Sequence, residues 1–184
     1  MSKLIIGLVG PIASGKGEIK KYLQEKYGAN EHRFSTMLRD VLNRMHIETS
    51  RKNLQDVSSV LRQQFGGDLL AKVLTEDVKN DDSQLIVIDG IRRFDDIQYL
   101  KDLAEFNLVS VNATEEVRYQ RSVSRNENIG DNNKSFAEFQ AEGSAEAELE
   151  IPKVMASTEI KIENNGTIED LHLDIDKLLA NLRR

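Results

Sequence analysis

The chain has 184 residues, 39% of them hydrophobic, which is enough for one buried core and predicts a single domain over residues 1–184. Its formal net charge of -6 at pH 7 argues against a non-specific nucleic-acid binder, which usually carries a basic excess. The lack of cysteine excludes disulfides, and no apolar stretch approaches the roughly 18 residues needed to span a bilayer. We therefore expect a cytoplasmic protein with neither membrane nor nucleic-acid partners.

The first half of the chain alternates apolar runs with helical patterns. The run Lys3–Val9 is apolar almost throughout, as parallel strands covered on both faces usually are. A helix is expected at Gly17–Lys26, and a short strand at His32–Thr36 leads into another helix. The region Asn53–Lys79 is predicted to be helix broken at Gly66–Gly67. One of its stripes consists of Leu54, Val57, Val60 and Leu61.

The second half repeats the alternation. Strands are expected at Gln84–Asp89, Phe106–Ala113 and Thr158–Asn164, and each is followed by a helical pattern. Thr114 and Thr167 are the predicted N-caps of the helical patterns that follow the last two of these strands. The alternation predicts an α/β fold with three α/β/α layers and a mainly parallel, five-stranded sheet.

The segment Glu127–Glu150 differs in composition, with seven acidic residues and one lysine. It begins with loop-forming residues and continues as a polar helix. Two readings are open: a solvated surface helix, or a lid-like insertion that closes over a site.

The stretch G-P-I-A-S-G-K-G follows the first strand and opens the first helix. In such a loop the backbone N–H groups and the positive end of the helix converge on an anion. Gly10 and Gly15 permit the tight path, Ala13 and Ser14 lie within it, and Lys16 can reach the β- and γ-phosphates of a nucleotide. The pattern and its context predict a nucleotide-phosphate site.

Gly17 stands where most phosphate-loop proteins carry a hydroxyl that holds Mg²⁺. The run G-K-G resembles adenylate kinases, which read G-K-G-T, but Glu18 replaces the threonine. Coordination of the metal by the loop itself is therefore in doubt. Glu18 either acts on the metal through a water or is a favourable acid in the first helical turn.

Two further stretches resemble nucleoside monophosphate kinases of the P-loop superfamily. S-T-M-L-R-D-V-L resembles the segment whose arginine binds the acceptor phosphate, which implies acceptor contacts by Thr36 and Arg39. L-I-V-I-D-G-I-R-R-F resembles the strand that ends in D-G-F-P-R. This resemblance implies that Asp89 orients Mg²⁺ through water, that Gly90 lines the acceptor pocket and that Arg93 binds phosphate. From the residues alone, Arg39 could equally be a surface charge.

Two stretches nearer the C-terminus extend the resemblance. R-Y-Q-R-S-V-S-R resembles the helix that enters the lid, which implies phosphate and nucleotide contacts by Arg121 and Arg125. The turn at Asn164, Asn165 and Gly166 is similar to one near the donor adenine in dephospho-CoA kinases and archaeal adenylate-kinase-related proteins. An ordinary Asn-Gly turn explains the same residues. The three histidines do not cluster at metal-ligand spacing, and all are predicted to be structural.

Phosphoryl transfer needs two substrates brought together and their charge offset, and arginine grips phosphate oxygens bidentately. The resemblance implies a P-loop NTPase fold with a helical lid. It also implies an enzyme that uses ATP and Mg²⁺ to phosphorylate a nucleoside monophosphate or similar nucleotide. Dephospho-CoA or a deoxynucleotide as acceptor is an alternative. Another is an ATP-binding sensor or ATPase without efficient transfer, because Gly17 and Glu18 offer the metal no hydroxyl. The acceptor and the oligomeric state do not follow from the sequence.

Overall fold

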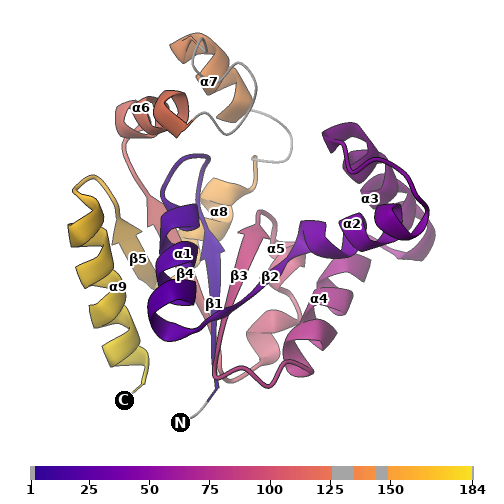
Figure 1. The fold of residues 1–184 in the computed structure, drawn as a ribbon, viewed down its shortest axis with the longest axis horizontal. Coiled ribbons are helices and arrows are strands. Elements are labelled where there is room, and N and C mark those ends of the chain that lie inside the picture. The colour runs from indigo at the N-terminus through magenta and orange to yellow at the C-terminus, as the bar shows by residue number, and fades with distance from the viewer. Residues whose placement is uncertain (1–2, 126–134, 144–148, 184) are drawn as a thin grey trace.

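Five parallel strands form one sheet at the centre of the molecule, in the order β2-β3-β1-β4-β5 (Figure 1). The structure is a computed structural model that describes residues 3–125, 135–143 and 149–183. The strands are β1 (Leu4–Val9), β2 (Asn30–Arg33), β3 (Leu85–Ile91), β4 (Phe106–Asn112) and β5 (Ile160–Glu163). Every ladder between them is parallel, which confirms the predicted α/β class and five-stranded sheet.

Helices cover both faces of the sheet and complete the three predicted layers. On one face α1 (Lys16–Tyr27) and α9 (Ile168–Leu182) pack over a core that includes Leu85 and Val87. The core on the other face includes Ile86 and Ile88. The elements that cover it are α2 (Phe34–Arg44), α3 (Arg51–Phe65), α4 (Leu69–Lys79), α5 (Phe94–Ile97), the short 3-10 helix η1 (Leu100–Asp102) and α8 (Ile151–Ala156).

The alternation along β3 decides where its last residues point. Successive side chains of a strand face opposite sides of the sheet, and Val87 packs with the α1 side. Asp89, two residues further on, therefore faces α1 as well, and its ion-pair distance to Lys20 of α1 agrees. Gly90 has φ +91°, a backbone conformation that favours glycine, and it lies where the register between β3 and β1 shifts before Ile91 pairs with Val9.

The predicted strand at His32–Thr36 is wrong in its second half, because α2 begins at Phe34. Phe34, Leu38 and Leu42 are all buried at a spacing of four residues, so a helix directs all three into one core whereas a strand would split them between faces. Within the predicted α3 stripe, Leu54, Val57 and Leu61 pack against the core, but Val60 is 56% exposed. The helical pattern after β3 is also shorter than expected, since α5 ends at Ile97.

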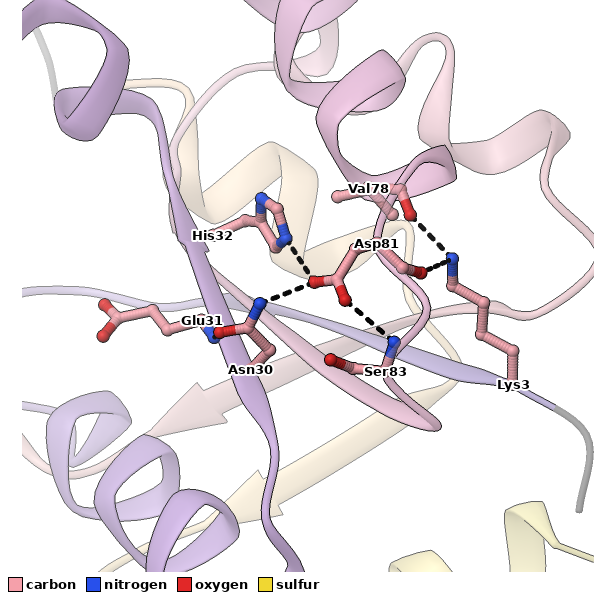
Figure 2. A network of polar contacts seen from close by, with 7 residues as sticks. All are labelled: Lys3, Asn30, Glu31, His32, Val78, Asp81 and Ser83. Carbon is pink, nitrogen blue, oxygen red and sulfur yellow. Dashed lines mark hydrogen bonds and ion pairs between the residues drawn. The ribbon is translucent and has the colours of Figure 1, made fainter. Parts of the chain in front are cut away.

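A polar network fastens the amino edge of the sheet (Figure 2). The Asp81 carboxylate, in the turn before β3, accepts hydrogen bonds from Asn30 Nδ2 and the Ser83 amide, and His32 Nε2 lies 2.7 Å from it. Lys3 Nζ donates to the backbone carbonyls of Val78 and Asp81. Burial by itself raises the pKa of Asp81, but the hydrogen bonds outweigh it, and the pKa lies well below its usual range. The network therefore joins the beginnings of three strands.

The opposite, carboxyl edge gathers the loops that carry the predicted site. The G-x-x-x-x-G-K loop follows β1, and α6 (Glu115–Arg125) follows β4. Beyond this edge, α6 and α7 (Phe136–Gly143) stand on one side of the sheet and α2 with α3 on the other (Figure 1). Open α/β sheets bind ligands at this edge. Among the described residues no helix is both long and apolar enough to cross a membrane.

Candidate active site at the carboxyl edge of the sheet

The loop between β1 and α1 requires its glycines for close packing. A Cβ on Gly10 would lie 2.1 Å from the carbonyl oxygen of Val111 on β4. A Cβ on Gly15 would lie 2.1 Å from Nδ2 of Asn164, and Gly15 also has φ +111°. Ala13 has φ 59°, an uncommon value for a residue with a side chain. These contacts hold the loop in one tight path between β4 and the residues after β5.

The polar groups of this loop fit a phosphate group. The Ser14 side chain is fully buried, and its Oγ has no hydrogen-bond partner within the described part of the chain. Lys16 Nζ donates to the carbonyls of Gly10 and Pro11, at 2.6 and 2.9 Å. A buried hydroxyl without a partner is costly unless a ligand completes its bonding. A hydroxyl, a lysine and the N-terminus of α1 together suit the oxygens of a polyphosphate.

A pocket of about 240 Å³ adjoins the loop, and its lining includes Gly15, Glu18, Arg121, Asn164, Ile168 and Leu171. Asn164 is buried and donates from Nδ2 to the Ser14 carbonyl at 2.9 Å. Arg121 donates to the Asn164 carbonyl at 2.9 Å and to its Oδ1 at 3.3 Å. The residues predicted as the turn after the last strand and as part of the helix that enters the lid therefore meet beside the phosphate loop.

Glu18 has a partner that its position in the sequence did not suggest. Its Oε1 lies 3.0 Å from Nε2 of His172 on α9, and the His172 ring stacks on Tyr22 with centroids 3.8 Å apart. The contact joins α9 to the first turns of α1. In this arrangement Glu18 anchors the helix that forms one wall of the pocket.

Asp89 lies at the end of β3 within a cluster of charges. Its Oδ2 is 3.8 Å from Lys20 Nζ and 3.5 Å from Arg33 Nε. Both cations also pair with Glu31, at 2.9 and 3.3 Å. The parallel register of β2 and β3 sets Arg33 opposite Asp89, so the sheet itself creates this pair. Asp89 is therefore a carboxylate at the ligand edge whose side chain is 15% exposed.

The predicted acceptor residues lie on the other side of this edge. Thr36 and Arg39 are exposed on α2, and neither side chain makes a hydrogen bond or ion pair within the described part of the chain. Thr36 also lines a smaller pocket of about 70 Å³ between β2, α2 and α4. Gly90 lies near the end of β3, where a Cβ would be 3.9 Å from the Phe34 side chain of α2, and Arg93 lies in the turn between β3 and α5.

A buried carboxylate shapes the turn that carries Arg93. Asp96 is 5% exposed, and its Oδ2 accepts hydrogen bonds from the backbone amides of Arg92 and Arg93 at 2.9 and 3.0 Å. Burial raises the pKa of Asp96 although these amides and the Arg62 guanidinium oppose it. Asp96 thereby fixes the backbone from which both arginines project.

Of the predicted lid segment, residues 127–134 and 144–148 lie outside the described residues, and so does the Arg125 side chain. The helix of this segment that the structure describes, α7, packs on α6 through aromatic contacts. Phe139 is 1% exposed, and the Tyr119 ring lies edge-on to Phe136 with centroids 5.1 Å apart. Gln140 donates to Glu115 at 3.1 Å. This helix is more than a solvated surface helix, because it buries an aromatic side chain.

Arg118 is a residue that the sequence analysis missed. It lies in the first turn of α6 and donates from NH1 to the Ile12 carbonyl of the phosphate loop at 3.3 Å. Its Nε donates to the Ala113 carbonyl at 3.2 Å, and its guanidinium lies over the Phe139 ring. The one available signal was a third arginine in the same helix, three residues before Arg121.

Comparison with known proteins agrees with this geometry. A family model described as an AAA domain, AAA_18, matches residues 6–142, most of the chain and the whole of the phosphate loop. The chain belongs to this family. Its fold is that of the kinase-like P-loop proteins that the sequence resemblance indicated.

Relatives and solved structures cover nearly the full chain. A UPF0200 protein of Methanosarcina barkeri is 29% identical over 98% of this chain and 96% of its own length. A UPF0200 protein of Thermococcus sibiricus is 27% identical over 97% and 95%. The protein TT1252 of Thermus thermophilus has the same fold, with a TM-score of 0.68 and 18% identity over 99% of both chains. Shikimate kinase of Bacteroides thetaiotaomicron has a TM-score of 0.63 and 13% identity over 98% and 99%.

Proposed function

We propose that this chain is an ATP-dependent kinase that transfers the γ-phosphoryl group of ATP to a nucleoside monophosphate or a similar small nucleotide. One observation carries the proposal: the buried, unpartnered Ser14 Oγ lies in a glycine cradle that adjoins a pocket of about 240 Å³. A cradle for phosphates next to a pocket with both apolar and polar walls suits a nucleoside triphosphate. The family and the fold support a kinase.

Each side of the site has a task in this reaction. The triphosphate would lie on the loop amides, Ser14 and Lys16, and the base would lie in the pocket walled by Leu171 and Arg121. The acceptor would enter between α2 and the turn after β3, where Arg39 and Arg93 are the proposed phosphate ligands. Bound Mg²⁺ would offset charge on the phosphates, with Asp89 as the carboxylate that orients it through water.

The transfer itself needs little covalent help from the protein. An oxygen of the acceptor phosphate forms a bond to the γ-phosphorus, and the bond from that phosphorus to the β–γ bridging oxygen breaks. The electron pair stays on the bridging oxygen and ADP leaves. A dianionic acceptor phosphate has no proton to lose, so no general base is needed. Positioning and the cationic side chains supply the catalysis.

A specific observation favours a second candidate, an ATP-binding protein that transfers phosphate inefficiently. No hydroxyl follows Lys16, and Asp89 already lies within 4 Å of two cations, Lys20 and Arg33. Both features weaken the handling of the metal. Such a protein would bind ATP tightly and show slow, acceptor-independent hydrolysis.

The test is ADP formation from Mg²⁺·ATP, with and without AMP, CMP, UMP, GMP, their deoxy forms and dephospho-CoA. A kinase shows stimulation by one acceptor and yields a phosphorylated product of that acceptor. Lys16→Ala should abolish the stimulated rate, whereas Lys177→Ala, an exposed lysine of α9, should leave it unchanged. ADP release that is indifferent to every acceptor would refute the kinase and favour the second candidate.

A further inference from the structure

Arg118 is a half-buried cation beside the phosphate loop, and no carboxylate of the described residues lies within ion-pair distance of it. Within the described part of the chain, its guanidinium contacts the carbonyls of Ala113 and Ile12 and the face of the Phe139 ring, but no carboxylate within ion-pair distance. Burial lowers the pKa of Arg118, and the carboxylates of Glu115 and Glu116 only partly oppose this. A partly desolvated charge whose described contacts are neutral carbonyls and an aromatic ring is poorly compensated, so an anion that arrives from solution would stabilise it.

The position of this side chain parallels that of Lys16. Lys16 Nζ rests on the carbonyls of Gly10 and Pro11, and Arg118 NH1 rests on the next carbonyl along the loop, that of Ile12. Two cations from different helices are thus held on three consecutive carbonyls of the same stretch. Backbone carbonyls are weaker partners for cations than phosphate oxygens are, so either side chain gains by exchanging one for the other.

The contact with α7 fixes the guanidinium in place. Phe139 is almost fully buried, and the Arg118 guanidinium carbon lies 5.5 Å from the centre of its ring. Stacking on an aromatic face orients the plane of the guanidinium and leaves donors at its edge for an anion. The described contacts use Nε and NH1, so NH2 has donors to spare. Arg118 is therefore preorganised for a phosphate.

We propose that Arg118 is a further catalytic residue of this site, which binds the terminal phosphate of the bound nucleoside triphosphate next to Lys16. This inference rests on the proposed function and adds a residue that the kinase resemblance does not assign. When the triphosphate binds, the guanidinium leaves the Ile12 carbonyl and donates to phosphate oxygens. Since the side chain starts in α6 and packs on α7, the terminal phosphate also becomes linked to both helices.

The test compares ATP with ADP by isothermal titration of the full chain in the presence of Mg²⁺. Arg118→Ala should weaken ATP binding roughly ten- to a hundredfold, the cost of losing a charge-assisted hydrogen bond, while ADP binding changes by less than about threefold. Arg118→Lys should keep part of the preference for ATP over ADP, because a lysine retains the positive charge but cannot bind phosphate oxygens bidentately. Arg183→Ala, an exposed arginine near the end of α9, is the matched control and should change neither affinity.

If Arg118 only stabilises the loop and binds no phosphate, a different pattern is expected. In that case Arg118→Ala lowers the melting temperature and weakens ATP and ADP equally, and this result would overturn the inference. Unchanged ATP binding would overturn it too. A wild-type chain that binds ATP but phosphorylates no acceptor defeats the kinase proposal, while the ATP-to-ADP ratio still decides the role of Arg118. A wild-type chain that binds neither nucleotide defeats both.

Discussion

Asn164→Ala should both destabilise the fold and weaken nucleotide binding. The buried Asn164 amide supplies the hydrogen bond to the Ser14 carbonyl and accepts one from Arg121. Truncation leaves the Ser14 carbonyl without this donor, in a place where the surrounding side chains exclude water. An unsatisfied buried polar group costs about 1–3 kcal/mol. For a chain of this size, about 2 kcal/mol corresponds to a fall of roughly 4–8 °C in melting temperature.

The matched control is Asn107→Ala, because the Asn107 side chain makes an exposed hydrogen bond at the other end of β4. That change should stay within about 0.5 kcal/mol of wild type. Calorimetry gives the melting temperatures. Titration with ATP tests the loop, because Asn164→Ala removes the donor that holds the Ser14 carbonyl and should therefore weaken ATP binding. If Asn164→Ala has the same melting temperature as Asn107→Ala and binds ATP as tightly as wild type does, Asn164 does not hold the loop.

Three further changes test other parts of the molecule. Gly10→Ala should abolish ATP binding, because its Cβ would lie 2.1 Å from the backbone oxygen of Val111; unaltered binding by titration would show that the loop is not the phosphate site. Arg39→Ala should raise the KM for the acceptor and leave ATP affinity nearly intact, and wild-type kinetics with every acceptor would remove Arg39 from the acceptor site. Asp81 has a folded-state pKa below its usual value of about 3.9, so its ionised form stabilises the fold at neutral pH and that contribution fades as the pH falls below about 4. The difference in melting temperature between wild type and Asp81→Asn should therefore narrow as the pH falls from about 4 toward 2, and a gap that stays constant over this range would contradict the assigned hydrogen bonds.

The phosphate loop and the class of fold were accessible from the sequence because both rest on local patterns. A run such as Leu4–Val9 is apolar enough to be a strand buried on both faces, and the glycines and lysine after it have few other uses together. The cap at Thr167 was predicted from the same short-range logic, and its hydroxyl accepts from the Asp170 amide. Each of these features depends on residues a few positions apart.

The strand predicted at His32–Thr36 is wrong only from Phe34 onward, and this error shows the limit of prediction from local sequence. A β-rich stretch of five residues is compatible with strand or helix, and the burial of Phe34 with Leu38 and Leu42 in one core decided for helix. The partner of Glu18 was equally inaccessible, because His172 lies 154 positions away and approaches only when α9 packs beside α1. Long-range partners of this kind depend on the packing of whole elements.

The sequence by itself determined that this chain builds a parallel α/β sheet with a phosphate loop at its carboxyl edge, because strand period, glycine spacing and helix caps are local properties. Only the tertiary structure decided which charges meet there. It set Arg33 against Asp89 through the strand register, Asn164 beneath Arg121, and Arg118 on the loop beside Lys16. The physical reason is that a side chain is assigned its partners by the packing of elements distant in sequence, and the free energy of that packing is shared over the entire core.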